Sequence, residues 1–284
     1  MKAGIGGVFL TQNFLAVFLF LPMLCGPASA EPNHAETFEM ARAADPEAYD
    51  YAMKNKVEVV STDDGRTFLL WWQPLGFDFK NDTVLVSLGG TGGWATKDFE
   101  VWHPHIQERG YAILNVQWWY GRNQETHGYA RPRDIYEWVV AELERRAIPR
   151  GHVIFHGFSR GSTNSYAVTF LDRKQKTPYF ALTVSNSGAL EPDYPPNKTF
   201  LQGDAGAKPF AGSRWILYCS ENDAERENAC MKMDATKSLL EAHGGKVDEF
   251  IRDSVGGHGG FMNPRVLDPA LDAADRIVSE QTAH

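Results

Sequence analysis

The sequence predicts an α/β fold in which a mostly parallel central sheet, with an antiparallel hairpin at its N-terminal end, carries helices on both faces. Two observations predict this class. Short continuous apolar runs recur along the chain and are separated by segments of helical length, a pattern typical of parallel strands buried on both faces. Ahead of them, two apolar runs flank the turn residues Asp63, Asp64 and Gly65, which indicates a hairpin.

The expected elements follow in order from these patterns. A polar helical lead-in over residues 34–55 precedes the strands. The strands are expected at residues 57–62, 67–74, 83–88, 111–118, 152–156, 179–185, 214–220 and 247–252. Between and after them, helices are expected over residues 98–109, from Asp134 onward, over 161–171, over 224–243 and from Asp268 to the C-terminus.

Capping signals support several of these helices. Asp134 with Glu137 three residues later matches a helix start, Gly244–Gly245 matches a helix end, and Asp268–Pro269 matches another start. Residues 187–213 are rich in Pro, Gly and Asp and are expected to form a long loop.

The first 30 residues have the pattern of a secretory signal peptide. A positive start at Lys2 is followed by an apolar run and then by the small residues Ala28-Ser29-Ala30, where cleavage is expected. We therefore expect residues 1–30 to be removed and residues 31–284 to form a single domain, which is secreted or periplasmic.

No stable membrane span is expected after this cleavage. The apolar run is short for a transmembrane helix, and Pro22 and Pro27 follow it. A lipid anchor on Cys25 is the alternative interpretation of this leader.

Charge and cysteine content restrict the function further. The formal net charge of −8, with no run of Lys or Arg, argues against nucleic acid and anionic membranes as main partners. Cys219 and Cys230 remain after cleavage, and an even number of cysteines in an oxidising compartment favours a disulfide between them. Two unpaired small hydrophobic residues are the alternative.

The segment Gly-Phe-Ser-Arg-Gly places Ser159 between an expected buried strand and an expected helix. A sharp strand-to-helix turn of this kind needs glycines, here Gly157 and Gly161, and it exposes the serine hydroxyl at the carboxyl end of the sheet. The alternative is a serine that only caps the helix. The context predicts a nucleophile.

A nucleophilic serine needs a base and a carboxylate that orients the base. Asp223 follows the strand at 214–220, and His258 follows the last strand within a glycine-rich loop, so both are expected at the same sheet edge as Ser159. Glu221 is the alternative acid. His127, His152 and His156 are alternative bases by residue type, with structural or substrate-facing roles expected instead.

These residues carry a resemblance to a known superfamily. In GFSRG, SEND and GGHGG, and in the order serine, acid, histidine, the chain resembles an α/β-hydrolase, specifically a secreted serine esterase. The resemblance implies the α/β-hydrolase fold, with Ser159 as nucleophile, His258 as general base and Asp223 as orienting acid.

Two backbone amides are expected to form the oxyanion hole. One is the N–H of Arg160, and the resemblance implies the N–H of Thr91 as the other, within a glycine-rich loop. That loop also matches a dinucleotide-binding pattern at Gly90, Gly92 and Ala95, but the next strand ends without the acidic residue that such sites use.

Aromatic residues near this sheet edge are expected to bind substrate. Trp94, Trp119 and Tyr120 are predicted to form an apolar wall; Trp118 belongs to the same aromatic cluster, and core packing is its alternative role. The arginines Arg122, Arg131 and Arg133 are candidates for contact with an acidic substrate group.

The sequence thus predicts a serine hydrolase that cleaves a small-molecule or polymer ester through an acyl-enzyme, without a cofactor or metal. His103 and His105 flank a proline, yet no third metal ligand is evident. A peptidase of the same superfamily and a catalytically silent binding protein on the same fold are the alternative functions.

Overall fold

The structure is a computed structural model that describes residues 33–202, 206 and 208–283. Pro32–His284 form one compact unit. The expected signal peptide, residues 1–30, lies outside the described residues.

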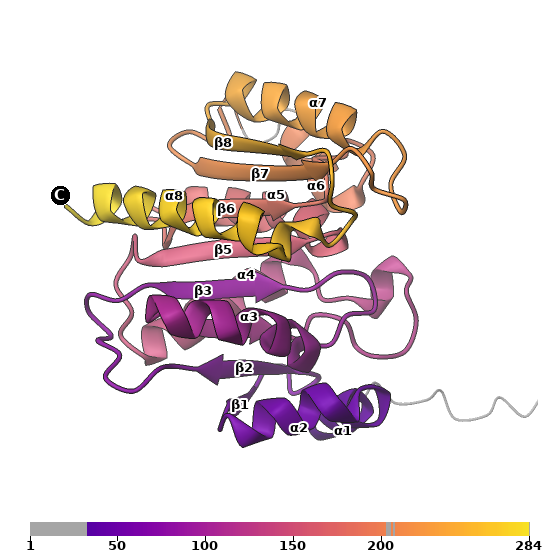
Figure 1. Cartoon of the computed structure of the whole chain (residues 1–284), viewed down its shortest axis with the longest axis vertical. Coiled ribbons are helices and arrows are strands. Elements are labelled where there is room, and N and C mark those ends of the chain that lie inside the picture. Colours follow the sequence, from indigo (N-terminus) through magenta and orange to yellow (C-terminus); the bar gives the residue numbers. More distant parts are fainter. Residues whose placement is uncertain (1–32, 203–205, 207, 284) are drawn as a thin grey trace, which may run out of the picture. The chain divides into compact units, whose positions relative to one another are not determined.

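The described residues form an eight-stranded sheet in the order β1-β2-β4-β3-β5-β6-β7-β8 (Figure 1). Its strands are β1 (Glu58–Ser61), β2 (Phe68–Trp72), β3 (Val84–Leu88), β4 (Ala112–Val116), β5 (Val153–Phe158), β6 (Phe180–Asn186), β7 (Arg214–Ser220) and β8 (Lys246–Asp253). Strand β2 pairs antiparallel with β1 and β4, whereas all pairs from β4 to β8 are parallel. The predicted fold class, including the N-terminal hairpin, is confirmed.

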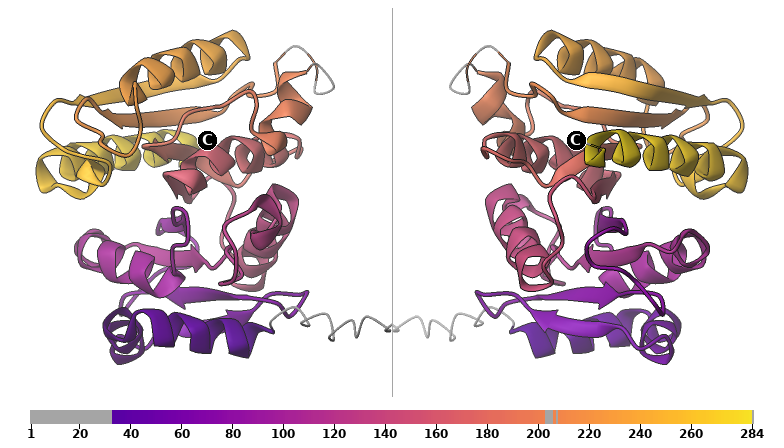
Figure 2. Two further views of the ribbon diagram at one scale, coloured as in Figure 1. Left: turned by 90° about the vertical axis from the view of Figure 1, so that its right-hand side faces the viewer. Right: turned by 90° about the vertical axis from the view of Figure 1, so that its left-hand side faces the viewer.

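Helices cover both faces of this sheet (Figure 2). They are α1 (His34–Ala44), α2 (Pro46–Lys54), α3 (Ala95–Arg109), α4 (Pro132–Arg145), α5 (Arg160–Arg173), α6 (Pro195–Leu201), α7 (Ala229–Ala242) and α8 (Pro264–Thr282). Phe99 of α3 and Leu271 of α8 share one apolar core, whereas Val139 of α4 lies in a second core and Tyr166 of α5 packs with Met233 of α7 in a third. The sheet separates cores on its two faces, because successive buried residues of a strand point to opposite faces.

Several helix boundaries differ from the prediction because caps lie elsewhere. The lead-in is two helices, since the side chain of Asp45 accepts the N–H of Ala48 and Pro46 occupies the first position of α2. Helix α4 begins at Pro132. Asp134 is its third residue, and its carboxylate accepts a hydrogen bond from the backbone N–H of Arg131.

The two C-terminal helices also begin elsewhere than expected. Helix α7 begins at Ala229 rather than at residue 224, because the preceding segment forms a turn. Helix α8 begins at Pro264, where the side chain of Asn263 accepts the N–H of Arg265. The segment expected to be a long loop, residues 187–213, contains the short helix α6.

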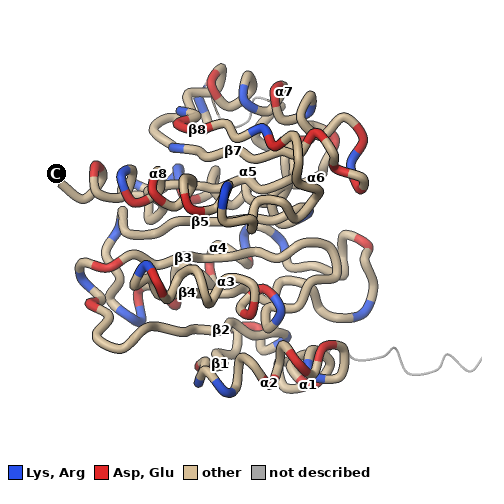
Figure 3. The backbone as a smooth tube through the Cα atoms, in the orientation of Figure 1, with Lys and Arg blue, Asp and Glu red and all other residues tan. Residues whose placement is uncertain are grey.

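Charge does not single out one element of the fold. In the view of Figure 3, basic and acidic residues are interspersed along the described chain. Among the described residues, no helix combines the length and the apolar character needed to cross a bilayer.

Candidate active site

Ser159 lies at a sharp turn between β5 and α5, with φ of 54° and ψ of −116°. A non-glycine residue in such a region costs on the order of 1–3 kcal/mol. The turn needs the glycines on both sides of the serine: a Cβ on Gly157 would lie 2.5 Å from the carbonyl oxygen of Gly161, and one on Gly161 would lie 2.5 Å from that of Leu88. The packing therefore fixes Ser159 at the carboxyl edge of the sheet.

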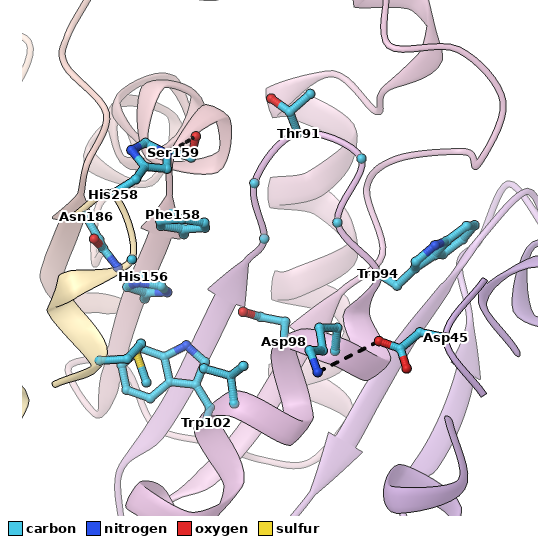
Figure 4. Close-up of a pocket in the computed structure, with 18 of the residues that line it drawn as sticks. Asp45, Thr91, Trp94, Asp98, Trp102, His156, Phe158, Ser159, Asn186 and His258 are labelled. Carbon is cyan, nitrogen blue, oxygen red and sulfur yellow. Dashed lines mark hydrogen bonds and ion pairs between the residues drawn. The ribbon is translucent and has the colours of Figure 1, made fainter. Parts of the chain in front are cut away.

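The structure brings Ser159, His258 and Asp223 together in a hydrogen-bonded chain. Figure 4 shows the part of this chain that joins Ser159 to His258. The Oγ of Ser159 lies 2.8 Å from Nε2 of His258, and Nδ1 of His258 lies 2.7 Å from Oδ2 of Asp223. Because a carboxylate only accepts, Nδ1 carries a proton, and Nε2 is free to accept the serine proton. The imidazole and carboxylate side chains are 7 % and 1 % exposed, so water does not compete for these bonds.

Asp223, and not Glu221, faces the histidine. The second oxygen of Asp223 accepts the backbone N–H groups of Glu225 and Arg226, which holds the carboxylate in place. The carboxylate of Glu221 is half exposed and lies 3.6 Å from Nε of Arg252. The same two amide bonds form the turn that delays the start of α7.

A disulfide restrains the loop that carries Asp223. Cys219 at the end of β7 is joined to Cys230 in the first turn of α7. The backbone N–H of Glu221 also donates to the carbonyl of Asp253, at 2.9 Å, which ties this loop to the end of β8. The loops of the acid and the histidine are therefore held to each other.

Asp253 anchors the loop that leads from β8 to His258. Its buried carboxylate accepts two bonds from Arg265, of 2.6 and 2.8 Å, one from the N–H of Val255 at 2.9 Å and one from the hydroxyl of Tyr218 at 3.1 Å. Burial opposes ionisation, but the hydrogen bonds from Arg265 and from backbone amides outweigh it and lower the pKa of Asp253 to about 2.

We expect Asp253→Asn to lower the free energy of unfolding by about 2 kcal/mol at neutral pH, because it weakens bonds to a buried charged acceptor whose partner Arg265 is half exposed. The folded pKa of about 2 lies below the ordinary aspartate pKa of about 3.9. The carboxylate's contribution is thus complete above about pH 4 and is lost as the pH falls through about 2, so the deficit of the variant should shrink in acid.

Urea unfolding of wild type and Asp253→Asn across this pH range measures the effect. Asp234→Asn is the matched control, because Asp234 pairs with Arg252 on the surface and is half exposed. The control should change stability by less than about 0.5 kcal/mol. A deficit for Asp253→Asn that grows on acidification would mean that the ionised carboxylate of Asp253 is not the source of the stabilisation.

The glycine-rich loop after β3 lies beside Ser159. A Cβ on Gly90 would lie 3.2 Å from Cβ of Ser159, whereas Thr91 occupies the outer bend of the loop in Figure 4. The amides of Gly90 and Thr91 are therefore both candidate oxyanion donors. The N–H of Arg160 is the other, because it is the first amide of α5 and has no acceptor within the helix.

Three hydrogen bonds to residues in the segment after β4 hold this loop in place. The indole N–H of Trp118 donates to the carbonyl of Gly89 at 3.0 Å, and the N–H of Gly92 donates to the hydroxyl of Tyr129 at 2.9 Å. The side chain of Gln117 accepts the N–H of Ala95 at 2.7 Å. These bonds hold the loop in one conformation and do not use the backbone N–H groups of Gly90 and Thr91, which remain available as oxyanion donors.

The side chain of Arg160 contacts Tyr129, which accepts the hydrogen bond from Gly92 of the glycine-rich loop. Its guanidinium lies 3.9 Å from the ring centroid of Tyr129 and donates to the carbonyl of Gln124 at 2.6 Å. The side chain is therefore occupied outside the cavity.

A cavity of about 700 Å³ opens in front of Ser159 and His258. The glycine-rich loop and Trp94 form part of its lining, together with the apolar side chains of Trp102, Phe158 and Met262. This volume suits a small organic ligand. Figure 4 shows Trp94 across the cavity from the catalytic serine and histidine candidates.

Two of the three predicted wall residues lie elsewhere. Trp119 packs behind Trp94, with ring centroids 4.9 Å apart, and its indole N–H bonds to the carbonyl of Asn123. Tyr120 is buried, and its hydroxyl accepts a hydrogen bond from Arg66. Neither Trp119 nor Tyr120 is among the residues that line the cavity. Trp118 is core, as one interpretation held.

The alternative histidines do not contact the serine hydroxyl. His156 is buried below the turn, where its ring bonds to Ser87 and Asn186, and burial lowers its pKa to about 3. His127 lies in a short 3₁₀ turn and His152 precedes β5.

His103 and His105 do not form a metal pair. His103 is buried and bonds to the hydroxyl of Tyr51 at 2.8 Å, and residues two positions apart on a helix do not face each other. In the described part of the chain, no group of three or more His, Cys, Asp or Glu has a geometry suited to a metal ion.

Sequence reasoning missed several ionisable residues of the cavity, since Asp45, Lys97, Asp98 and Glu225 all line it. Asp98 of α3 lines it together with His156, and neither residue belongs to a motif. The missed signal is only that residue 98 follows the glycine-rich loop by one helical turn.

No protein-family model matches this sequence, and no curated protein matches it. Solved structures do. An esterase from Rhizomucor miehei shows 17 % identity and a TM-score of 0.61 over 86 % of this chain and 91 % of its own. Esterase B from Lactobacillus rhamnosis shows 13 % identity and a TM-score of 0.59, over 88 % and 97 %. Brefeldin A esterase, a bacterial homologue of human hormone-sensitive lipase, shows 13 % identity and 0.57, over 91 % and 89 %.

Proposed function

We propose that this chain, which has the α/β-hydrolase fold of those esterases, is a serine hydrolase that cleaves carboxylic esters through an acyl-enzyme. One observation carries the proposal: the hydrogen-bonded chain from Ser159 through His258 to Asp223, placed at the mouth of a cavity. Esterase activity of the structural neighbours supports the choice of esters.

In the first half of the reaction, Oγ of Ser159 attacks the ester carbonyl while Nε2 of His258 takes its proton. Asp223 keeps the proton of His258 on Nδ1 and stabilises the imidazolium that forms. The negative charge on the carbonyl oxygen is held by the N–H of Arg160 and by the N–H of Thr91 or its neighbour Gly90. Each such donor typically lowers the barrier by about 3 kcal/mol.

The imidazolium returns its proton to the leaving alkoxide, and the alcohol departs, which leaves the acyl-serine. In the second half, His258 removes a proton from water, which attacks the acyl carbonyl; the imidazolium then gives this proton to Oγ of Ser159 as the acid product leaves. The buried positions of the imidazole and of Asp223 favour this role, because their bonds are shielded from solvent.

The substrate is expected to be small, since a cavity volume of about 700 Å³ fits a small ester. The leader pattern of residues 1–30 and the cysteine pair Cys219 and Cys230 support an exported enzyme.

Labelling with a fluorophosphonate tests this function. Intact-mass spectrometry of the mature protein should show one adduct, and digestion should map it to Ser159, because only an activated serine attacks the reagent. Hydrolysis of a panel of short-chain esters should accompany it. An unlabelled, folded protein without ester turnover would favour a silent binding protein instead.

A further inference from the structure

The floor of the cavity holds a chain of polar side chains that the proposed mechanism does not use. His156 of β5 lies below the turn of Ser159, Ser87 lies on the neighbouring strand β3, and Asp98 lies in the first turn of α3. The hydroxyl of Ser87 is 3.0 Å from Nδ1 of His156 and also hydrogen-bonds the carboxyl of Asp98. Asp98 and His156 both line the cavity.

The hydrogen bonds of this chain run in one direction. The amide NH₂ of Asn186 lies 3.2 Å from Nε2 of His156, which therefore accepts. The proton of the neutral imidazole is then on Nδ1 and is donated to the oxygen of Ser87, whose own hydroxyl proton is left for Asp98. The NH₂ of Asn115 donates to Oδ2 of Asp98 at 2.8 Å.

Asp98 thus ends the chain as an acceptor at the cavity wall. A carboxylate has about four lone-pair positions, and these two donors occupy two of them. Trp102 lines the same cavity, and its ring centroid lies 4.8 Å from that of His156. Figure 4 shows Asp98, Trp102 and His156 around the same end of the cavity.

Removing a carboxyl group from water carries a cost. Burial raises the pKa of Asp98 above its ordinary value, although the bonds from Ser87 and Asn115 oppose this shift. A role limited to fastening α3 to the sheet would be served by a neutral side chain at lower cost. Because Asp98 is not completely buried and borders the cavity, its remaining lone pairs can accept hydrogen bonds from a bound ligand.

The geometry points to a substrate subsite at Asp98 that binds a hydrogen-bond donor, a hydroxyl or a primary ammonium group, carried by the acyl or the alcohol part of the ester. This inference rests on the proposed esterase function and names the class of ester that the cavity selects. An ester with a methyl group in that position leaves the Asp98 carboxyl unpaired when it expels water, and the enzyme therefore discriminates against it.

Matched ethyl esters and acetate esters test the subsite. Within each set the esters have the same chain length and differ only in the group at the end of the varied chain, which is methyl, hydroxyl or ammonium. Sets of several chain lengths are assayed, and hydrolysis is followed by titration of the released acid. For at least one length, kcat/KM should be about tenfold or more higher for a hydroxyl or ammonium member than for its methyl partner. A preference for ammonium alone identifies a cationic substrate, and a preference for hydroxyl identifies a neutral one.

Asp98→Asn should remove most of this preference while fluorophosphonate still labels Ser159. Glu108→Gln is the matched control, because Glu108 is exposed on the same helix away from the cavity, and it should keep the preference. If Asp98→Asn melts at a much lower temperature, Ser87→Ala provides the second test, since it removes a donor to the same carboxyl and should reduce the preference.

The outcomes separate the two proposals. Turnover of esters without any preference, or a preference that Asp98→Asn and Ser87→Ala leave intact, overturns the subsite alone. Absence of turnover with every ester overturns the esterase function and the subsite together.

Discussion

Ser159→Ala is expected to reduce kcat for ester hydrolysis by about a million-fold, because the variant lacks the oxygen that we propose to form the acyl bond. Its environment is otherwise kept: the backbone at φ of 54° tolerates alanine as poorly as serine, and the carbonyl of Ser159 still accepts the N–H of Thr163. Initial rates with a short-chain aryl ester measure the loss. Residual turnover above the rate in water reflects binding and the oxyanion donors alone.

A matched control is Ser165→Ala, which removes a hydroxyl one to two turns further along α5. The hydroxyl of Ser165 bonds to the carbonyl of Ser162 within the helix and does not line the cavity. This variant should keep its activity. A Ser159→Ala protein that melts like wild type and hydrolyses the ester at a comparable rate would show that another group is the nucleophile.

The strands were predictable because each is a continuous apolar run whose two faces are both covered. Val84, Leu85 and Val86 of β3, for example, are all buried, with alternate residues facing different cores. No alternation is needed to recognise such a strand. The same runs, separated by helical segments, also imply the parallel order that the structure confirms.

Helix starts were less predictable because they depend on which side chain caps them. Asp223 caps a turn of its own through the N–H groups of Glu225 and Arg226, which keeps α7 from starting at residue 224. In α8, Pro269 lies inside the helix rather than at its start, since the chain was already helical from Pro264. Local sequence patterns do not rank such competing caps.

The candidate site was predictable where its residues follow strand ends. Ser159, Asp223 and His258 come from loops after β5, β7 and β8, and parallel strands bring such loops to one edge. The same reasoning wrongly placed Trp119 and Tyr120 at the cavity, because the positions of their side chains depend on how the chain turns after β4. Such a turn has no signal in the sequence.

The cavity floor was not predictable at all. Asp98 and His156 meet through Ser87, and the contact depends on the register that places Ser87 beside His156 in the sheet. Register between strands far apart in the sequence is set by packing of the whole sheet. A carboxyl group in a helix is otherwise read as a solvated residue.

Asp223→Asn should lower kcat by about ten-thousand-fold, while Glu221→Gln should leave it nearly unchanged. An asparagine that donates its NH₂ toward Nδ1 of His258 would favour the tautomer with its proton on Nε2, so that the imidazole no longer accepts the serine proton 2.8 Å away. Glu221 is the control in the same loop, because its carboxylate pairs with Arg252 and is half exposed. Steady-state rates with one aryl ester compare the two variants.

The two substitutions remove the same formal charge from neighbouring positions, so a general electrostatic effect of the loop would lower both rates alike. A loss confined to Asp223→Asn requires direct contact with the imidazole, as the 2.7 Å bond to Nδ1 implies. A loss confined to Glu221→Gln would instead mean that the loop rearranges in solution and presents Glu221 to His258. Measurement of fluorophosphonate labelling rates in both variants checks the same point without turnover, because labelling also requires His258 to take the proton of Ser159.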